Sequence, residues 1–187
     1  MSLNIDLNYL FSGLIGAVIG ILSSFCIVIL KEYLDSKSCI QAITTELKCL
    51  NRLCTDTFDN CITDDETPLF LSYPLDTDYF SIFNANTSKI GKISDCFERE
   101  LVVQIYMLAK YFIDCLKTNN ECLSYFEKIE EKYKNNRNCN EYKEDIKFAN
   151  DNLKHSKINN ILPTYKKLKV LLETYLTMQN NKRWWQI

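Results

Sequence analysis

Two groups of lysines stand where the sequence offers chemistry for binding an anion. Lys89 and Lys92 flank Gly91, shortly before an expected helix start. The unpaired amides of a helix N-terminus favour phosphate, and nearby cations would add to that attraction. A second group puts three cations beside an aromatic ring: Tyr165, Lys166, Lys167 and Lys169. Both groups are candidate ligand-binding sites, and solvated lysines on helix surfaces are the alternative.

The sequence contains few residues in patterns that suit catalysis. The only histidine, His155, lies in the polar stretch NLKHSKINN, which is typical of a solvated side chain rather than a general base. Asp64, Asp65 and Glu66 lack the alternate spacing of a calcium-binding loop. The sequence contains no phosphate-cradling glycine loop, no nucleophile elbow and no pair of histidines at metal-binding spacing. We therefore expect no enzyme, no cofactor and no metal site.

The nine cysteines do not supply a metal site either. None of their spacings forms the C-x-x-C pair typical of zinc sites. In a reducing compartment such residues behave as small hydrophobic side chains. We expect them to serve packing.

Helices are the elements that must position these residues. The chain of 187 residues has only four glycines and three prolines, too few for the turns of an all-β domain. Its formal net charge of −2 gives no reason to expect binding to a nucleic-acid duplex. The charge is uneven, because residues 62–96 carry two basic and six acidic side chains, whereas residues 136–187 carry ten basic and five acidic ones.

The first helix has the length and composition of a membrane span. Leu10 to Leu30 is a stretch of 21 residues without a charge, close to the roughly 20 that a span needs. The leader before it has no lysine or arginine, which argues against a cleaved signal peptide. Basic residues follow this stretch and none precedes it, so the N-terminus is expected outside. We expect residues 1–30 to form a leader and a transmembrane span, and residues 31–187 a cytoplasmic domain.

Within this stretch a small residue recurs at every fourth position: Ser12, Gly16, Gly20 and Ser24. On a helix these residues lie along one side and let two backbones approach closely, which is how helices associate in lipid. The sequence therefore predicts a homo-oligomer joined through the span. Since glycine is common in membrane helices, chance is the alternative explanation.

The pattern after Leu30 continues without glycine or proline to about Thr57, so we expect the membrane helix to extend into the cytoplasm. Asn119 and Asn120 are expected to interrupt a later helix. The further helices are expected over Tyr79 to Asn84 (capped by Asp76 or Thr77), from a cap at Ser94 to about Lys117, over Glu121 to Lys134, over Glu141 to about Lys154, and from Pro163 onward. The predicted fold class is all-α, with one N-terminal transmembrane helix continuing into a cytoplasmic bundle of four to five helices.

Aromatic residues gather before and within the first short helix. The group is Phe70, Tyr73, Tyr79, Phe80 and Phe83. We expect it to pack beneath a loop, with a ligand pocket as the alternative. The chain ends in KRWWQI, whose paired tryptophans beside cations suit a membrane interface, a neighbouring subunit or the protein's own surface.

The order of these features resembles a known type of protein. A short leader precedes the span GLIGAVIGILSSFCIVIL, a basic helix follows, and DYFSIFNANTSKIGKI comes before ELVVQIYMLAKYF. Over about the first 115 residues this order resembles small single-span bacterial membrane proteins with a helical cytoplasmic domain. Some of these look like membrane effectors of antiviral defence, including retron-linked and cyclic-oligonucleotide-gated CRISPR ancillary proteins.

The resemblance implies an effector that self-associates through its span. It would perturb the inner membrane when its cytoplasmic domain senses a cyclic oligonucleotide or a protein activator. The alternative is a membrane-tethered helical scaffold that recruits a partner protein and leaves the membrane intact. No catalytic residue is carried over by the resemblance.

Overall fold

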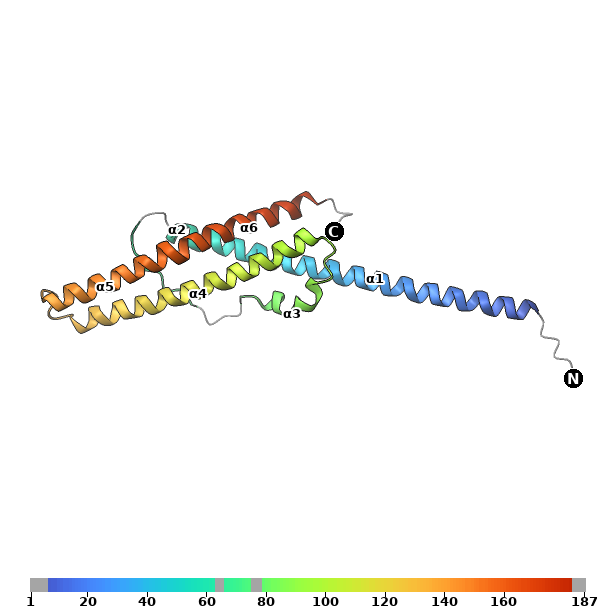
Figure 1. The fold of residues 1–187 in the computed structure, drawn as a ribbon, viewed down its shortest axis with the longest axis horizontal. Helices are drawn as coiled ribbons and strands as arrows, with labels where there is room; N and C mark the ends of the chain where they lie inside the picture. The colour runs from blue at the N-terminus through green and yellow to red at the C-terminus, as the bar shows by residue number, and fades with distance from the viewer. Residues whose placement is uncertain (1–6, 63–65, 75–78, 183–187) are drawn as a thin grey trace.

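The computed structural model of the chain describes residues 7–62, 66–74 and 79–182 (Figure 1). Its regular elements are all helical, which confirms the predicted all-α class. In order they are α1 (Leu7–Leu53), the π-helical turn η1 (Cys54–Phe58), α2 (Asp59–Cys61), α3 (Ser81–Ile90), α4 (Cys96–Lys132), α5 (Asn140–Ser156), the π-helical turn η2 (Lys157–Ile161) and α6 (Leu162–Asn181). Because each π-helical turn joins its neighbours without a break, the described residues form four helices.

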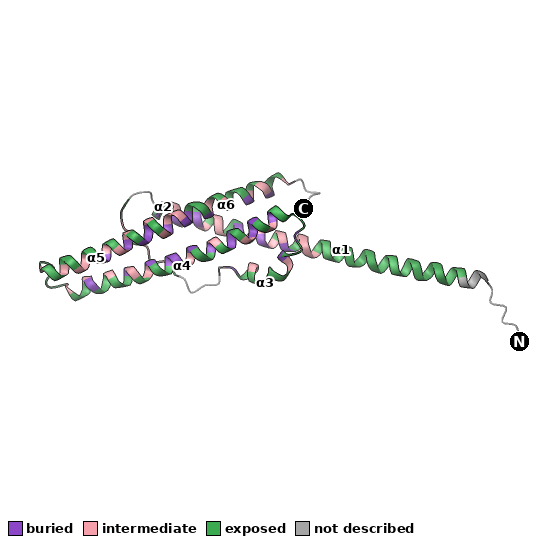
Figure 2. Cartoon of the chain, viewed as in Figure 1, coloured by how far each residue is buried: buried purple, intermediate pink, exposed green. Residues whose placement is uncertain are grey.

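α1 is the longest element and leaves the rest of the molecule at one end (Figure 1). Residues 11–34 are exposed throughout (Figure 2), and an 18-residue stretch of the helix has a mean hydropathy of 2.6. The helix is therefore long and apolar enough to cross a membrane, which is consistent with a membrane anchor or a signal sequence. Together with η1 and α2 it reaches Cys61, slightly beyond the predicted end near Thr57.

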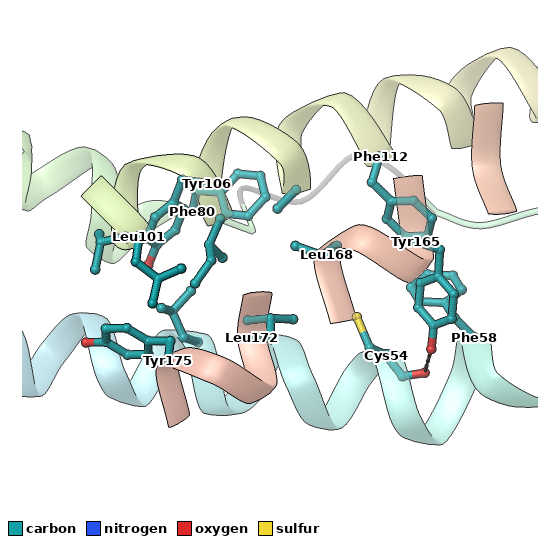
Figure 3. Packing of buried hydrophobic residues seen from close by; sticks show 14 of the residues in the cluster. Cys54, Phe58, Phe80, Leu101, Tyr106, Phe112, Tyr165, Leu168, Leu172 and Tyr175 are labelled. Carbon is teal, nitrogen blue, oxygen red and sulfur yellow. Dashed lines mark hydrogen bonds between the residues drawn. The ribbon is translucent and has the colours of Figure 1, made fainter. Parts of the chain in front are cut away.

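The core lies where the second half of α1 meets the first half of α4 and α6 (Figure 3). Its fully buried side chains recur every three or four residues, as on the buried face of an amphipathic helix. They include Ile43, Leu47, Val102, Ile105, Leu168 and Leu172. The apolar spacing along these helices also predicts burial of Tyr33 and Phe97, but both are exposed. Tyr33 precedes the point where α1 enters the bundle, and Phe97 lies in the first turn of α4.

α4 runs for 37 residues, so the interruption predicted at Asn119 and Asn120 is wrong. The buried amide of Asn119 donates to the carbonyls of Leu69 and Leu71, each at 3.2 Å. Asn120 donates to the carbonyl of Tyr73 at 2.8 Å and accepts from its amide at 3.2 Å. These two side chains satisfy the backbone of the loop that crosses them, and they do not end the helix.

The N-cap of α4 is Asp95, one residue after the predicted cap, Ser94. One Asp95 carboxylate oxygen accepts from the amides of Phe97 at 2.9 Å and Glu98 at 3.3 Å. A carboxylate at this position also interacts favourably with the positive end of the helix dipole.

α3 begins and ends later than the predicted helix over residues 79–84. The expected caps, Asp76 and Thr77, lie outside the described residues, as do the C-terminal residues 183–187 with both tryptophans. α3 runs back toward the point where α1 leaves the bundle (Figure 1).

A carboxylate of α1 holds the start of α3. Glu46 accepts from the amides of Ile82 at 2.9 Å and Phe83 at 3.0 Å, and from the hydroxyl of Tyr106. Glu46 is almost fully buried, so these donors replace its water. One side chain thus joins α1, α3 and α4.

α5 and α6 form one helix through η2, where two separate helices were expected. η2 ends two residues before Pro163, which lies in the first turn of α6 as predicted. Pro163 has no amide hydrogen, so the backbone bonding there must change. Lys157 in η2 is buried, and its ammonium donates to the carbonyl of Thr67 at 3.1 Å.

The aromatic group packs on the helices. Phe70 is 56% exposed, and its ring lies edge-on to Phe126 of α4 at 5.2 Å between ring centroids. Tyr73 lies 5.1 Å from Phe58 between ring centroids, and Phe83 stacks on Tyr106 at 3.8 Å. A cavity of about 20 Å³ beside Tyr73 has room for about one water molecule. This geometry favours packing over the alternative of a ligand pocket.

Candidate functional site

The exposed apolar half of α1 is the first candidate site. Side chains such as Leu14, Ile21 and Phe25 are more than half exposed, and residues 11–30 carry no charge. Soluble proteins rarely leave a continuous apolar surface of this kind in water. A lipid bilayer or a second helix would cover it.

The predicted stripe of small residues lies on this uncovered part of α1. A Cβ atom added at Gly16 or Gly20 would meet nothing within 4 Å. The hydroxyl of Ser24 donates to the carbonyl of Gly20 at 2.9 Å, so it is satisfied within the helix. Packing inside this chain therefore does not explain either glycine. Ser12 lies at the N-terminal end of the same stripe.

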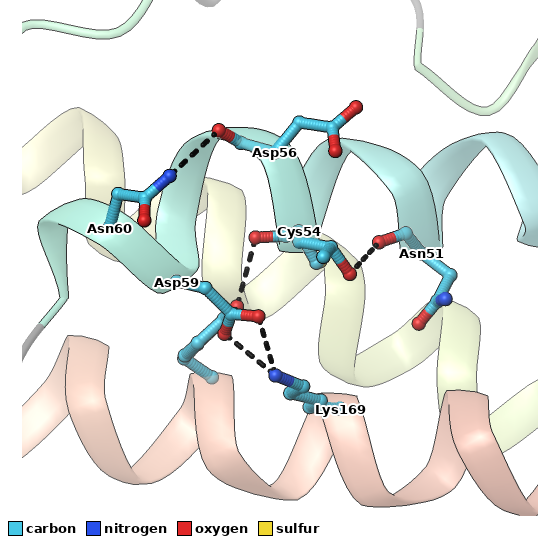
Figure 4. A network of polar contacts seen from close by, with 8 residues as sticks. Asn51, Cys54, Asp56, Asp59, Asn60 and Lys169 are labelled. Carbon is cyan, nitrogen blue, oxygen red and sulfur yellow. Dashed lines mark hydrogen bonds and ion pairs between the residues drawn. The ribbon is translucent and has the colours of Figure 1, made fainter.

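The second candidate site is a polar cluster where η1 meets α6 (Figure 4). The ammonium of Lys169 donates to both carboxylate oxygens of Asp59, at 2.7 and 2.6 Å. The hydroxyl of Tyr165 lies 2.6 Å from the same carboxylate and 3.0 Å from the carbonyl of Cys54. We call Cys54, Asp59, Tyr165 and Lys169 the η1 clamp.

The π-helical turn creates this arrangement. The amide of Asp59 donates to the carbonyl of Cys54, five residues back instead of four. The extra residue in the turn shifts Asp59 toward α6 and leaves the Cys54 carbonyl within reach of Tyr165. Sequence reasoning missed Asp59, because the 3–4 spacing of the apolar seam gives no sign of this change of register. Its one signal is an acidic residue directly after the buried Phe58.

The protonation states in the η1 clamp favour an ion pair. The hydrogen bond from Lys169, and then that from Tyr165, hold the pKa of Asp59 below its usual value. The bond to Asp59 likewise raises the pKa of Lys169. Burial raises the pKa of the Cys54 thiol to about 12, so the sulfur is protonated at neutral pH and is a poor nucleophile. This chemistry suits a structural clamp between α1 and α6.

The second lysine group does not converge. Tyr165 is buried and Lys169 binds Asp59, whereas Lys166 and Lys167 are exposed. Positions four apart share one side of a helix, and the positions between them point elsewhere. The structure thus brings Tyr165 and Lys169 together around Asp59 and leaves Lys166 and Lys167 on another side of α6.

Lys89 and Lys92 lie together near the end of α3, but the amides expected beside them are occupied. Asp95 already accepts from the first amides of α4. Lys89 is half-buried, and Lys92 is exposed with its ammonium 3.8 Å from a carboxylate oxygen of Glu32. Lys92 therefore faces the part of α1 that leaves the bundle.

The remaining polar candidates lie on the surface. His155 is exposed and its ring nitrogen lies 2.9 Å from the side-chain amide of Asn159. Glu66 is exposed and pairs with Lys154 at 2.7 Å, while Asp64 and Asp65 are outside the described residues. No group of three or more potential metal ligands occurs in the parts of the chain that the structure describes.

No protein family, curated protein or solved structure matches the chain. The function is therefore inferred from α1 and from the helical domain that holds its second half.

Proposed function

We propose that the chain is a single-span protein of the bacterial inner membrane, with its N-terminus outside and its helical domain in the cytoplasm. We further propose that it is a membrane effector of antiviral defence. Copies associate through the stripe Ser12, Gly16, Gly20 and Ser24, and a signal sensed by the domain leads the clustered spans to perturb the membrane.

The continuity of α1 carries this proposal. The same helix presents uncovered apolar side chains over residues 11–30 and buries Ile43 and Leu47 in the core. Its far end is fixed to α6 by the ion pair between Asp59 and Lys169. Because a continuous helix moves largely as one body, a shift of the domain is transmitted to the segment outside it. A flexible linker would lose that movement.

Paired substitutions in the stripe test the effector function. Gly16→Leu with Gly20→Leu should abolish oligomers and growth inhibition, because the larger side chains keep two backbones apart. The matched control is Gly13→Leu with Ala17→Leu, which has the same spacing on a neighbouring side of the helix. Cross-linking in native membranes measures the oligomers, and growth after induced expression measures toxicity. Toxicity that persists unchanged in the first pair would contradict the mechanism.

The second candidate function is a membrane-tethered scaffold that recruits a partner protein, which we call the tether. The η1 clamp favours it. Tyr165 and Lys169 belong to a candidate site for an anionic ligand, yet both bind Asp59 within the domain. The hairpin of α4 and α5 extends away from α1 (Figure 1) and exposes Tyr125 and Phe148, a surface that suits a protein partner.

Two measurements separate these functions. Oligomers that leave the membrane potential intact, as reported by a voltage-sensitive dye, would favour the tether over the effector. Nucleotide binding that is lost on replacing Lys166 and Lys167 with alanine would favour ligand gating instead. A wild-type protein that binds no cyclic oligonucleotide would remove that signal from the proposal.

A further inference from the structure

One corner of the helical domain lies where α1 leaves it (Figure 1). The corner consists of the end of α3, the turn that follows and the first turn of α4. Its exposed or half-buried side chains include Lys89, Lys92, Phe97 and Arg99. We call these four residues the α3–α4 corner.

Contacts with α1 fix the height of this corner relative to the apolar stretch. The hydroxyl of Ser36 donates to the carbonyl of Lys92 at 3.3 Å. The Lys92 ammonium lies 3.8 Å from a carboxylate oxygen of Glu32. At about 1.5 Å of rise per residue, Glu32 lies about 3 Å and Ser36 about 9 Å beyond Leu30, the last residue of the uncharged stretch.

These heights correspond to the surface of a bilayer. The headgroup layer extends about 5–8 Å on each side of the hydrocarbon core. With Leu30 at the edge of that core, the Lys92 ammonium lies within the headgroup layer and the backbone of the corner lies at its outer boundary. The same α1 helix that crosses the bilayer therefore holds the corner against the lipid.

The corner is held in shape by its own contacts. Arg99 donates to the carbonyls of Gly91 at 3.4 Å and Ile93 at 3.2 Å, and the Ile93 side chain is buried in the core. Two nearby carboxylates are already bound, because Asp95 caps α4 and Glu98 binds Gln179 and Lys182.

The exposed chemistry of the corner matches a lipid interface. Phe97, in the first turn of α4, is 59% exposed. Aromatic rings favour the level of the headgroups, and cations there attract anionic lipid phosphates. A hollow of about 490 Å³ opens between α3 and α4 beside the corner, with Ile90 and Arg99 in its wall.

We propose that the α3–α4 corner binds the phosphate groups of anionic phospholipids through Lys92 and Lys89, with Phe97 entering the interface. This inference rests on the proposed function in that α1 must cross the bilayer. It assigns a lipid ligand to the two lysines from which the sequence predicted binding of an anion. The domain is then held against the membrane at a second point, beside its connection to α1.

A photoreactive benzoylphenylalanine at position 97 tests this contact in the full-length protein. The protein is reconstituted in bilayers that contain phosphatidylglycerol, irradiated and analysed by mass spectrometry. The matched control carries the same group at Phe148, which is equally exposed at 59% but lies on α5, in the hairpin that extends away from α1. We expect a phospholipid adduct at position 97 and none at position 148.

The contribution of charge is measured with Lys92→Gln in the position-97 protein. We expect the adduct yield to be several-fold higher in phosphatidylglycerol bilayers than in phosphatidylcholine bilayers, and Lys92→Gln to lower that ratio by up to about fivefold. The exposed Lys143→Gln on α5 should leave the ratio unchanged. An equal ratio in the wild-type and Lys92→Gln proteins would overturn the role of the lysine.

Other outcomes separate this inference from the proposed function. A covalent dimer formed at position 97 without a lipid adduct would assign the corner to a subunit interface and overturn the inference. A protein that resists carbonate extraction but gives no adduct overturns the inference alone. A protein that carbonate releases from the membrane overturns both.

Discussion

Replacing Glu46 with alanine should release α3 from α1. Glu46 is the acceptor for two amides at the start of α3 and for the hydroxyl of Tyr106. The substitution leaves these three donors partly or fully buried without their partner. It also removes a negative charge that interacts favourably with the positive N-terminal end of the α3 dipole.

The magnitude follows from those three hydrogen bonds. A bond to a charged group contributes about 1.5–3 kcal/mol, and a buried donor left unpaired adds a desolvation cost. Since the first turn of α3 is partly open to water, which can replace some bonds, we expect a total loss of about 3–5 kcal/mol. For a protein of this size that corresponds to a fall in Tm of about 10–15 °C.

Thermal unfolding of the full-length protein in detergent micelles, followed by circular dichroism, measures this loss. Tyr106→Phe removes one of the three donors and should cost about 1 kcal/mol. The control is Glu121→Ala, which removes an exposed carboxylate from α4 and should change Tm by no more than about 2 °C. If Glu46→Ala lowers Tm no more than this control does, the carboxylate does not hold α3.

Three further predictions concern the η1 clamp and the loop beneath α4. Because the pKa of Asp59 is lowered in the folded protein, its contribution to stability is present above the usual carboxyl pKa and is lost as the pH falls through the lowered value. Asp59→Asn should therefore make Tm fall less steeply between about pH 5 and pH 2 than in the wild type. At pH 8, maleimide should modify Cys54 about a thousandfold more slowly than the exposed Cys61, as peptide mapping of the labelled native protein would measure. Asn119→Ala removes the donor to two loop carbonyls and should lower Tm by about 5–8 °C, whereas the exposed Asn138→Ala should leave it nearly unchanged.

Helix content and the long first helix could be predicted from the sequence because their signals are local. The scarcity of glycine and proline indicates helices, and an uncharged stretch from Leu10 to Leu30 determines how far α1 stays apolar. The buried positions Ile43 and Leu47 follow from 3–4 spacing. Each of these features depends on residues within a few turns of one another.

The errors concern side chains whose partners are distant in sequence. Asparagine is a weak helix former, so Asn119 and Asn120 indicate a break unless their bonds to a loop about 50 residues earlier are known. The cap of α3 likewise comes from Glu46, 36 residues before Ile82. Local capping rules cannot identify such donors and acceptors.

The same limit applies to the candidate sites. Tyr165 and Lys169 were grouped with Lys166 and Lys167 as a candidate ligand site, but the partner of Lys169, Asp59, lies 110 residues away. Its position depends on a π-helical turn that the apolar pattern does not indicate. An aromatic ring and a cation were therefore interpreted as a ligand site, although a carboxylate of the same chain binds both.

The two lysine groups lead to opposite conclusions because of where α1 runs. At α6, Asp59 of α2, which continues α1 through η1, pairs with Lys169 and fixes this helix to the domain. At the α3–α4 corner the exposed part of α1 begins, and the Lys92 ammonium lies 3.8 Å from a carboxylate oxygen of Glu32. Lys169 stabilises the fold, whereas Lys92, which is exposed beside Glu32, is the cation that we propose binds a lipid phosphate. If α1 transmits movement between the domain and the membrane, that movement must change the contacts at two places, the Asp59–Lys169 pair and the α3–α4 corner. Substitutions at both points should therefore show coupled effects on toxicity, while either point tested with an exposed α5 residue such as Lys143 should show additive ones.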